Sequence, residues 1–332
     1  FLTVLEPHEG IPRVKSARAL DENTVEVTLV DGTVDRLKIK NFYNTQSKPS
    51  VELHRNGKLL EKTECGDRRP ACPRPGKTVC FRHRTLPEST RDGYAAAVDK
   101  RCFEKLRRGE IHASSFALND VWVPLYNLHK MLAGLRDADQ LCGITAAREI
   151  AHRQAHYLMD VWRNLNDDQL QEILKCEHGG IAETLINLAE TTGDRECLDF
   201  ACRAFCQKSA LDPLRAGRDK LDGMHGNTMI PKVIGLAELY DAAGDENARH
   251  AAEFFFNRVV NFRSFANGGN GESEHFFTIG TEKDHLTAFT TESCNSYNMV
   301  KLAEHIFEWK PQSKVMDFVE RTLLNHIVAN IG

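Results

Sequence analysis

The feature that most constrains the fold of this chain is a repeated pair of helices. Three stretches share one plan, in which an amphipathic helix, a short glycine-containing turn and a second amphipathic helix follow one another. They are LHKMLAGLRDADQLCGITAAREIAHRQAHYL, IAETLINLAETTGDRECLDFACRAF and VIGLAELYDAAGDENARHAAEFFF. The turn glycines Gly143, Gly193 and Gly244 lie 50 and 51 residues apart. A period near 50 built from helical hairpins is typical of a solenoid or a closed ring, so we expect a mainly α fold.

The segments that join one hairpin to the next differ from the turns inside the hairpins. The joining segments VWVPLYN, CEHGG, LDGMHGNTMIP and GGNGESEHFF are rich in Gly, His, Asn and acidic residues, whereas the inner turns are short and plain. A fourth hairpin follows an insertion and turns at Lys310-Pro311. This asymmetry favours a toroid of the (α/α)6 type, incomplete in this chain, with its polar loops gathered at one mouth.

A different pattern precedes the hairpins. Residues 1–62 alternate apolar and polar positions around the turns Asp31-Gly32 and Asn56-Gly57, which predicts a small antiparallel β module. Residues 63–92 are rich in Pro, Arg, Cys and Thr without periodicity, so we interpret them as an irregular linker. We therefore expect three parts: a β module at 1–62, a linker at 63–92 and a partial α/α toroid catalytic domain at 93–332.

The composition excludes some classes of function. Of 332 residues, 41% are hydrophobic and 27% charged, with a formal net charge of -4, as in an ordinary globular protein. A pI near 6.4 gives no basic face for nucleic acid, and no apolar run approaches the roughly 20 residues that span a bilayer. Phe1 is not an initiator Met, and Gly332 follows an unfinished apolar run. We therefore interpret both ends of the sequence as truncated. The sequence determines neither the oligomeric state nor the compartment, which is either cytoplasmic or periplasmic/secreted.

Residues with useful chemistry fall in the joining segments of successive hairpins. They are His129; Glu177 and His178; Asp222 and His225; Glu272, Glu274 and His275; and Glu292 with Cys294. A His or an acidic residue recurs at the corresponding position of successive repeats. This recurrence is easier to explain as an active site than as solvated surface. By contrast, we interpret His152, His156, His250, His305 and His326 as ordinary helical residues.

Two of these segments suggest a reaction. The glycine-rich run before Glu272 delivers Glu272, Glu274 and His275 beside the aromatic Phe276. Sugar hydrolysis needs a proton donor, and we expect Glu274, desolvated by the aromatic ring, to stay protonated near neutral pH. Cys294 is a nucleophile if its pKa is lowered, or a zinc ligand together with Glu292. Tetrahedral zinc takes three or four protein groups, so this pair is half of a site.

The longest motifs resemble a known family. VWVPLYNLHKMLAGL, EHGGIAETLINLAETTGD, LDGMHGNTMIPKVIGLAELYDAAGDE, GGNGESEHF and ESCNSYNMVKLAEHIFEW resemble the β-L-arabinofuranosidases of glycoside hydrolase family 127 and relatives such as family 146. The resemblance covers roughly Gly93 to Gly332. It implies an (α/α)6 toroid that removes L-arabinofuranose from plant-type glycans or arabinosides by a retaining, zinc-thiolate mechanism.

The resemblance also implies roles for particular residues. Glu274, in ESEHF, matches the general acid/base, and Glu292 and Cys294, in ESC, match two zinc (Zn²⁺) ligands. The expected partner is a carbohydrate substrate, with neither nucleic acid nor membrane involved. The residues that we expect to bind substrate are His129, His178, His225, Asn227, Glu272 and His275.

The chain also departs from the family pattern. The family nucleophile is a zinc-bound cysteine of a Cys-Cys pair downstream of the Glu-x-Cys motif, and no such pair occurs in this sequence. We therefore expect little or no turnover by residues 1–332 alone. Two alternatives remain: a carbohydrate-binding or assembly protein without catalysis, and a toroid polysaccharide lyase, which only the β module suggests.

Overall fold

A computed structural model describes residues 14–21, 24–40, 50–64, 92–96 and 98–330. The chain divides into two compact units, one with a five-stranded sheet and one with the helices, and each is described here by itself. Most of the expected linker, residues 65–91, lies outside the described residues. The boundaries expected at 62 and 92 therefore stay predictions.

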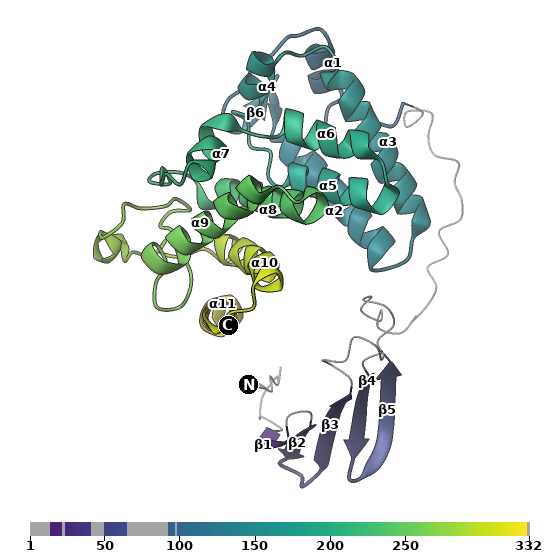
Figure 1. Ribbon diagram of the computed structural model, residues 1–332, viewed down its shortest axis with the longest axis vertical. Coiled ribbons are helices and arrows are strands. Elements are labelled where there is room, and N and C mark those ends of the chain that lie inside the picture. Colours follow the sequence, from purple (N-terminus) through teal and green to yellow (C-terminus); the bar gives the residue numbers. More distant parts are fainter. Residues whose placement is uncertain (1–13, 22–23, 41–49, 65–91, 97, 331–332) are drawn as a thin grey trace. The chain divides into compact units, whose positions relative to one another are not determined.

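The first unit is an antiparallel meander in which each strand pairs with the next along the chain (Figure 1). Its strands are β1 (Val14–Asp21), β2 (Thr24–Leu29), β3 (Val34–Lys40), β4 (Ser50–Arg55) and β5 (Lys58–Glu64). Asn56 and Gly57 both have positive φ, 47° and 82°, as a tight turn between β4 and β5 requires. The predicted antiparallel module is confirmed.

The second unit consists of helices and one short pair of strands. Its elements are α1 (Arg101–Arg107), β6 (Ala117–Leu118), β7 (Val121–Trp122), α2 (Pro124–Gln140), α3 (Thr145–Trp162), α4 (Asp167–Ile173), α5 (Ile181–Thr192), α6 (Arg195–Ala204), α7 (Lys208–Arg215), α8 (Gly226–Ala243), α9 (Glu246–Phe262), α10 (Ser293–Trp309) and α11 (Ser313–Thr322). No described helix is long and apolar enough to cross a bilayer.

The turns inside the second and third hairpins have the same construction. Gly193 and Gly244 end α5 and α8 with φ of 75° and 71°, a left-handed conformation that glycine adopts without steric cost. The next residues, Asp194 and Asp245, accept backbone N–H groups of the following helix and so cap α6 and α9. Each Gly-Asp pair thus stops one helix and starts the next.

The hairpins pack side by side through their first helices. α5 packs on α6 and α8, and α8 packs on α9 and α10. Accordingly, α8 is buried on nearly all sides, and its Gly235 allows close approach to Ala182 of α5, because a Cβ there would stand 3.1 Å from the Ala182 Cβ. The mainly helical class expected from the sequence is confirmed.

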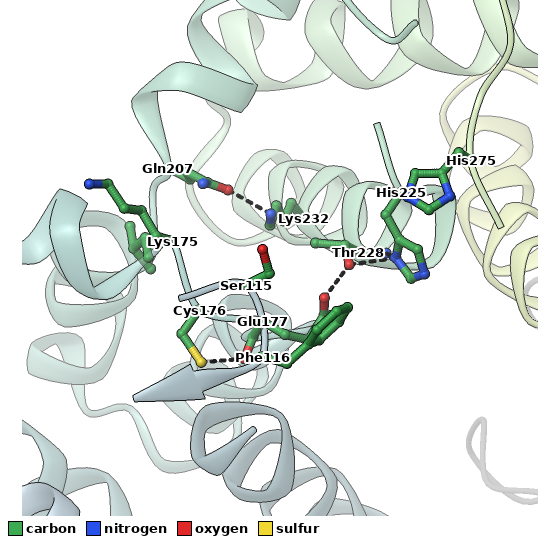
Figure 2. A pocket seen from close by; sticks show the side chains of 11 residues that line it. Ser115, Phe116, Lys175, Cys176, Glu177, Gln207, His225, Thr228, Lys232 and His275 are labelled. Carbon is green, nitrogen blue, oxygen red and sulfur yellow. Dashed lines mark hydrogen bonds between the residues drawn. The ribbon is translucent and has the colours of Figure 1, made fainter. Parts of the chain in front are cut away.

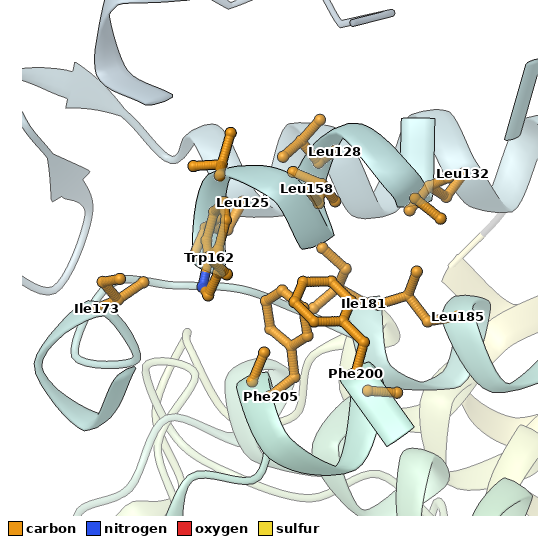
Figure 3. Close-up of a cluster of buried hydrophobic side chains, with 14 of the residues drawn as sticks. Leu125, Leu128, Leu132, Leu158, Trp162, Ile173, Ile181, Leu185, Phe200 and Phe205 are labelled. Carbon is orange, nitrogen blue, oxygen red and sulfur yellow. The ribbon is translucent and has the colours of Figure 1, made fainter. Parts of the chain in front are cut away.

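Leucine, isoleucine and aromatic side chains of the first two hairpins form one core cluster (Figure 3). Trp162 of α3 is fully buried, and its ring lies 6.3 Å from Phe200 and 6.2 Å from Phe205. Since interiors of this kind are close-packed, the helices are held rigidly and so are the segments at their ends. Those segments carry several buried or half-buried polar residues, among them Glu177 and His225.

Candidate active site

The first turn of α8 and the segments before it form one wall of a pocket of about 270 Å3, here called the His225 pocket. Its lining includes Glu177 and His275 from two joining segments, Gln207 from the start of α7 and Lys232 from within α8. Figure 2 shows Thr228 between Glu177 and His225, with the Lys232 ammonium directed at Gln207. Residues far apart in the sequence therefore meet at this mouth of the helical unit.

His225 orients Glu274, the expected acid/base. His225 caps α8, and its Nδ1 accepts the N–H of Thr228 at 3.1 Å, which leaves the ring proton on Nε2. That Nε2 lies 2.7 Å from Glu274 Oε2 and donates to it. The Thr228 hydroxyl donates in turn to Glu177, so a chain of hydrogen bonds runs from the buried Glu177 to Glu274.

The backbone around Glu274 is in an unusual conformation. Ser273 and Glu274 have φ of 47° and 68°, values that side-chain-bearing residues adopt rarely. Two backbone hydrogen bonds hold this strained conformation. Ser273 N donates to Phe289 O at 3.0 Å, and Gly226 N donates to Glu274 O at 2.7 Å. Such strain is typical of functional sites, where the surrounding structure fixes a reactive group.

The environment expected for Glu274 is wrong in one respect. Its side chain is 55% exposed, whereas the neighbouring Phe276 points into the core, with its ring 6.0 Å from that of Phe255. The left-handed backbone at Ser273 and Glu274 interrupts the extended run, so Phe276 is buried while the carboxylate faces solvent. Its partner is His225, not an aromatic ring.

A second pocket, of about 280 Å3, lies among the inner helices and is here called the His129 pocket. Helices α2, α5, α8 and α10 all contribute to it. Its polar lining includes His129, Arg136, Glu183, Asn227, Asn298 and Lys301. Asn227 accepts from the Asn298 amide at 2.8 Å, which joins α8 to α10 across the pocket.

His129 is neutral in this setting. Burial, with a further contribution from Lys130, lowers its pKa to about 4. Its Nδ1 accepts the N–H of Gly180 at 3.1 Å, so the proton is on Nε2, which is a donor available to a sugar hydroxyl. Gly180 and Gly179 permit this approach, because a Cβ on Gly179 would stand 2.6 Å from His129 Nδ1.

Charged groups of the His129 pocket neutralise one another. Glu183 is almost fully buried and lies 2.7 Å from Lys301 and 3.3 Å from Arg136. Burial raises the pKa of Glu183, but the Lys301 and Arg136 charges outweigh it and leave the pKa below its ordinary value. The pocket is therefore lined by an ionised carboxylate between two cations, a surface that suits the many hydroxyl groups of a sugar.

Glu292 and Cys294 begin α10, one turn before Asn298. Glu292 occupies the N-cap position without capping the helix, and its Oε2 is buried without a hydrogen-bond partner. Desolvation, followed by the Glu292 and Glu274 carboxylates, raises the pKa of the Cys294 thiol. Glu292 and Cys294 stand two residues apart at the start of α10, whose following turn, with Asn298, lines the His129 pocket.

Three other residues that we expected to bind substrate, His275, Glu272 and His178, do not line the His129 pocket. His275 lines the His225 pocket, with its ring 5.2 Å from that of His225. Glu272 accepts from Ser273 and Thr287 of its own loop, at 2.8 and 3.1 Å, and lines neither pocket. His178 is fully buried beside Phe205 and also lines neither pocket, while burial lowers its pKa to about 3.

Sequence reasoning missed several residues of the site. Glu183, Lys301, Arg136 and Lys232 lie inside helices, where charged residues are normally solvated. No local motif distinguishes them, because the contacts among Glu183, Lys301 and Arg136 span 47 to 118 residues. The sequence does contain a signal for Thr228, because it lies three positions after His225, which is the spacing of an N-cap interaction.

A test of the contact between α8 and α10 is the substitution Gly226→Ala. The added Cβ would stand 2.5 Å from the Asn295 amide nitrogen, and Asn295 is fully buried, so its amide group would have to shift within a packed interior. We expect a loss of about 1–3 kcal/mol in the free energy of unfolding, together with loss of the Gly226–Glu274 hydrogen bond. Thermal unfolding measures the first effect. Gly134→Ala on α2, where a Cβ meets nothing within 4 Å, is the control and is expected to cost no stability; equal losses in both variants would contradict the packing argument.

Comparison with known proteins gives one family. Residues 85–332 match the family described as Beta-L-arabinofuranosidase, GH127 catalytic domain. Two solved structures are similar, a GH127 β-arabinofuranosidase (23% identity, 61% of this chain and 33% of that chain, TM-score 0.48) and a GH127 β-L-arabinofuranosidase from Geobacillus stearothermophilus T6 (19%, 68% and 37%, TM-score 0.49). This chain thus spans little more than a third of their length. Among curated proteins none matches.

Proposed function

Because the chain belongs to the GH127 catalytic-domain family of the β-L-arabinofuranosidases, we propose that it is part of a retaining glycoside hydrolase that releases L-arabinofuranose from plant-type glycans or arabinosides. The observation that carries the proposal is the pair of Glu274 and His225 at 2.7 Å, at the mouth of a pocket of sugar size. A carboxyl group set on a strained loop and oriented by a histidine is suited to proton transfer at a glycosidic oxygen.

In this proposal Glu274 is the general acid/base. It gives a proton to the glycosidic oxygen as the bond from that oxygen to the anomeric carbon breaks. It then takes a proton from the water that displaces the sugar from the enzyme nucleophile. His225 fixes the direction of the carboxyl group, and the Thr228–Glu177 hydrogen bond fixes His225.

We assign sugar binding to the His129 pocket and to the edge of the His225 pocket. His129 offers a donor at Nε2, and Asn227 and Asn298 offer amide groups from facing helices. Both hydrogen-bond donors and acceptors line this pocket. Hydroxyl groups of a furanose need both kinds of partner, since each is a donor and an acceptor.

Zinc fits the donor set only in part. The buried, unpartnered oxygen of Glu292 and the adjacent thiol of Cys294 are suitable ligands. Among the described residues, no third His, Cys, Asp or Glu atom groups with these two at ligand spacing. Bound zinc would keep a coordinated thiol deprotonated. We infer that the attacking thiolate is not Cys294 and expect slow turnover by residues 1–332, whose sequence contains no Cys-Cys pair.

The experiment measures binding and hydrolysis of aryl L-arabinofuranosides by residues 1–332. We expect the β-anomer to bind at least tenfold more tightly than the α-anomer and to release L-arabinose slowly. Equal affinity for the two anomers, or no binding of either, would overturn the proposal. Selective binding with no hydrolysis, unchanged by Glu274→Gln, would favour a carbohydrate-binding protein without catalysis.

A further inference from the structure

A second group of possible metal ligands consists of residues that line neither pocket. His152 and His156 are one turn apart on α3, and Asp194 stands at the turn between α5 and α6. They form the one group of three or more His, Cys, Asp or Glu residues at metal-ligand spacing in the described part of the chain. Two of the histidines that the sequence led us to interpret as ordinary helical residues thus lie together with Asp194.

The three side chains converge on one point. Each histidine Nε2 lies 2.8 Å from Asp194 Oδ2, and the two Nε2 atoms are 3.2 Å apart. The i,i+4 spacing places both rings on one face of α3, as in helical metal-binding motifs. Packing of α3 against α5 and α6 brings Asp194 opposite that face.

The spacing suits a tetrahedral ion. Ligands at about 2.0–2.1 Å from zinc are roughly 3.3 Å from one another. The observed separations of 2.8 to 3.2 Å need to change by only about half an ångström to reach that value. The rings are 39% and 42% exposed, so an ion can enter and water can complete the coordination.

Asp194 is free to serve as a ligand while it keeps its structural role. Its Oδ1 accepts the N–H of Glu196 at 2.9 Å and caps α6, and its Oδ2 faces the histidines. Imidazole with one carboxylate favours zinc and its neighbours in the transition series over magnesium or calcium, which prefer oxygen ligands. We propose that His152, His156 and Asp194 bind a structural zinc ion that fastens α3 of the first hairpin to the start of α6 in the second.

This proposal does not depend on the proposed hydrolase, and its test keeps the two metal sites apart. Zinc is titrated by calorimetry into the full chain with Glu292→Gln and Cys294→Ser, which removes the other donor pair. We expect one zinc ion per chain and, at a hundredfold excess of zinc over Kd, a rise in Tm of about 5 °C. Absence of zinc binding would overturn the assignment.

Substitutions in the same background identify the ligands. His156→Gln keeps a hydrogen-bond donor towards Asp194 but removes the ligand, and we expect zinc affinity to fall at least thirtyfold. Asp194→Asn keeps the helix cap and is expected to weaken binding at least tenfold. His250→Gln, at an exposed histidine of α9 outside the cluster, is the control and should leave the affinity unchanged. Zinc binding that survives His156→Gln would contradict the site.

The absorption spectrum of the cobalt-substituted protein distinguishes thiolate ligands from nitrogen and oxygen ligands. Cys197 Sγ lies 3.7 Å from Asp194 Oδ2, so a sulfur atom contacts the cluster. With three ligands and water, the cobalt-substituted protein has d–d absorption and no thiolate charge-transfer band. A thiolate band in the Cys294→Ser background would place Cys197 in the coordination shell and overturn the three-ligand assignment.

Discussion

Replacing Glu274 with glutamine is expected to slow the hydrolysis of a phenyl β-L-arabinofuranoside by about a hundredfold or more, the usual effect of removing a general acid. Glutamine has nearly the same shape and can still accept from His225 Nε2, so the loop should keep its conformation. Affinity for the arabinoside is expected to change less than threefold. Steady-state or long single-turnover assays, read against an enzyme-free blank, give the rate.

The leaving group distinguishes proton transfer from a structural role. A nitrophenyl group departs with little help from an acid, so Glu274→Gln should slow its release less than that of phenol. Glu272→Gln is the matched control, since Glu272 lies in the same loop and its carboxylate is held by Ser273 and Thr287. A loss of the same size for both leaving groups, or for both glutamates, would show that Glu274 does not donate the proton.

The second large effect is expected at Arg263, which is 2% exposed. Its guanidinium lies 2.7 and 3.0 Å from the two Asp219 oxygens and 2.6 Å from Asp222. It also donates to Phe277 O at 3.2 Å, so one side chain joins the segment before α8 to the segment that follows Glu274. Arg263→Leu leaves Asp219 with Arg258 as its remaining charged partner, takes Arg263 from Asp222 and removes the link to Phe277. We therefore expect it to destabilise the fold by about 3–5 kcal/mol.

Thermal unfolding measures this loss, which corresponds to a fall in Tm of roughly 10 °C. Arg249→Leu is the control, because its partners Glu246 and Glu253 lie on the exposed side of α9 and such pairs contribute about 1 kcal/mol or less. Equal losses would contradict the argument from burial.

The pH dependence of stability gives a further check on Arg263. Burial raises the pKa of Asp219, but hydrogen bonds from Arg263 and Arg258 outweigh it and lower the pKa below its ordinary value. The stabilisation is therefore complete above about pH 4 and is lost as the pH falls through the folded-state pKa. In Arg263→Leu, the decline of stability below pH 4 should be shallower than in the unaltered chain.

The sequence predicted the hairpins because their signals are local. Apolar spacing, Gly193 and Gly244 at helix ends, and aspartates immediately afterwards all act within a few residues. The same holds for the β module, where the Asn56-Gly57 turn and the alternation of side chains determine the pairing of strands.

Much of the candidate site depends on contacts that no local signal reports. The pairing of Glu274 with His225 joins residues 49 positions apart, and that of Lys301 with Glu183 joins residues 118 apart. Asp222 illustrates the limit, since the sequence makes it a candidate for catalysis whereas the structure pairs it with Arg263. Composition of a loop identifies residues available for chemistry, but packing decides which of them face the pocket.

The Gly193 and Gly244 turns have a practical consequence for handling the protein. A Cβ built on either glycine meets nothing within 4 Å, and each turn stands at the far end of a helix whose other end adjoins the pockets. For α5, 12 residues long, this separation is about 18 Å. Attachment to a bead or sensor surface is best made at the Gly244 turn, because the Gly193 turn adjoins Asp194 of the proposed zinc site. The sugar-facing loops would then remain open to large glycans.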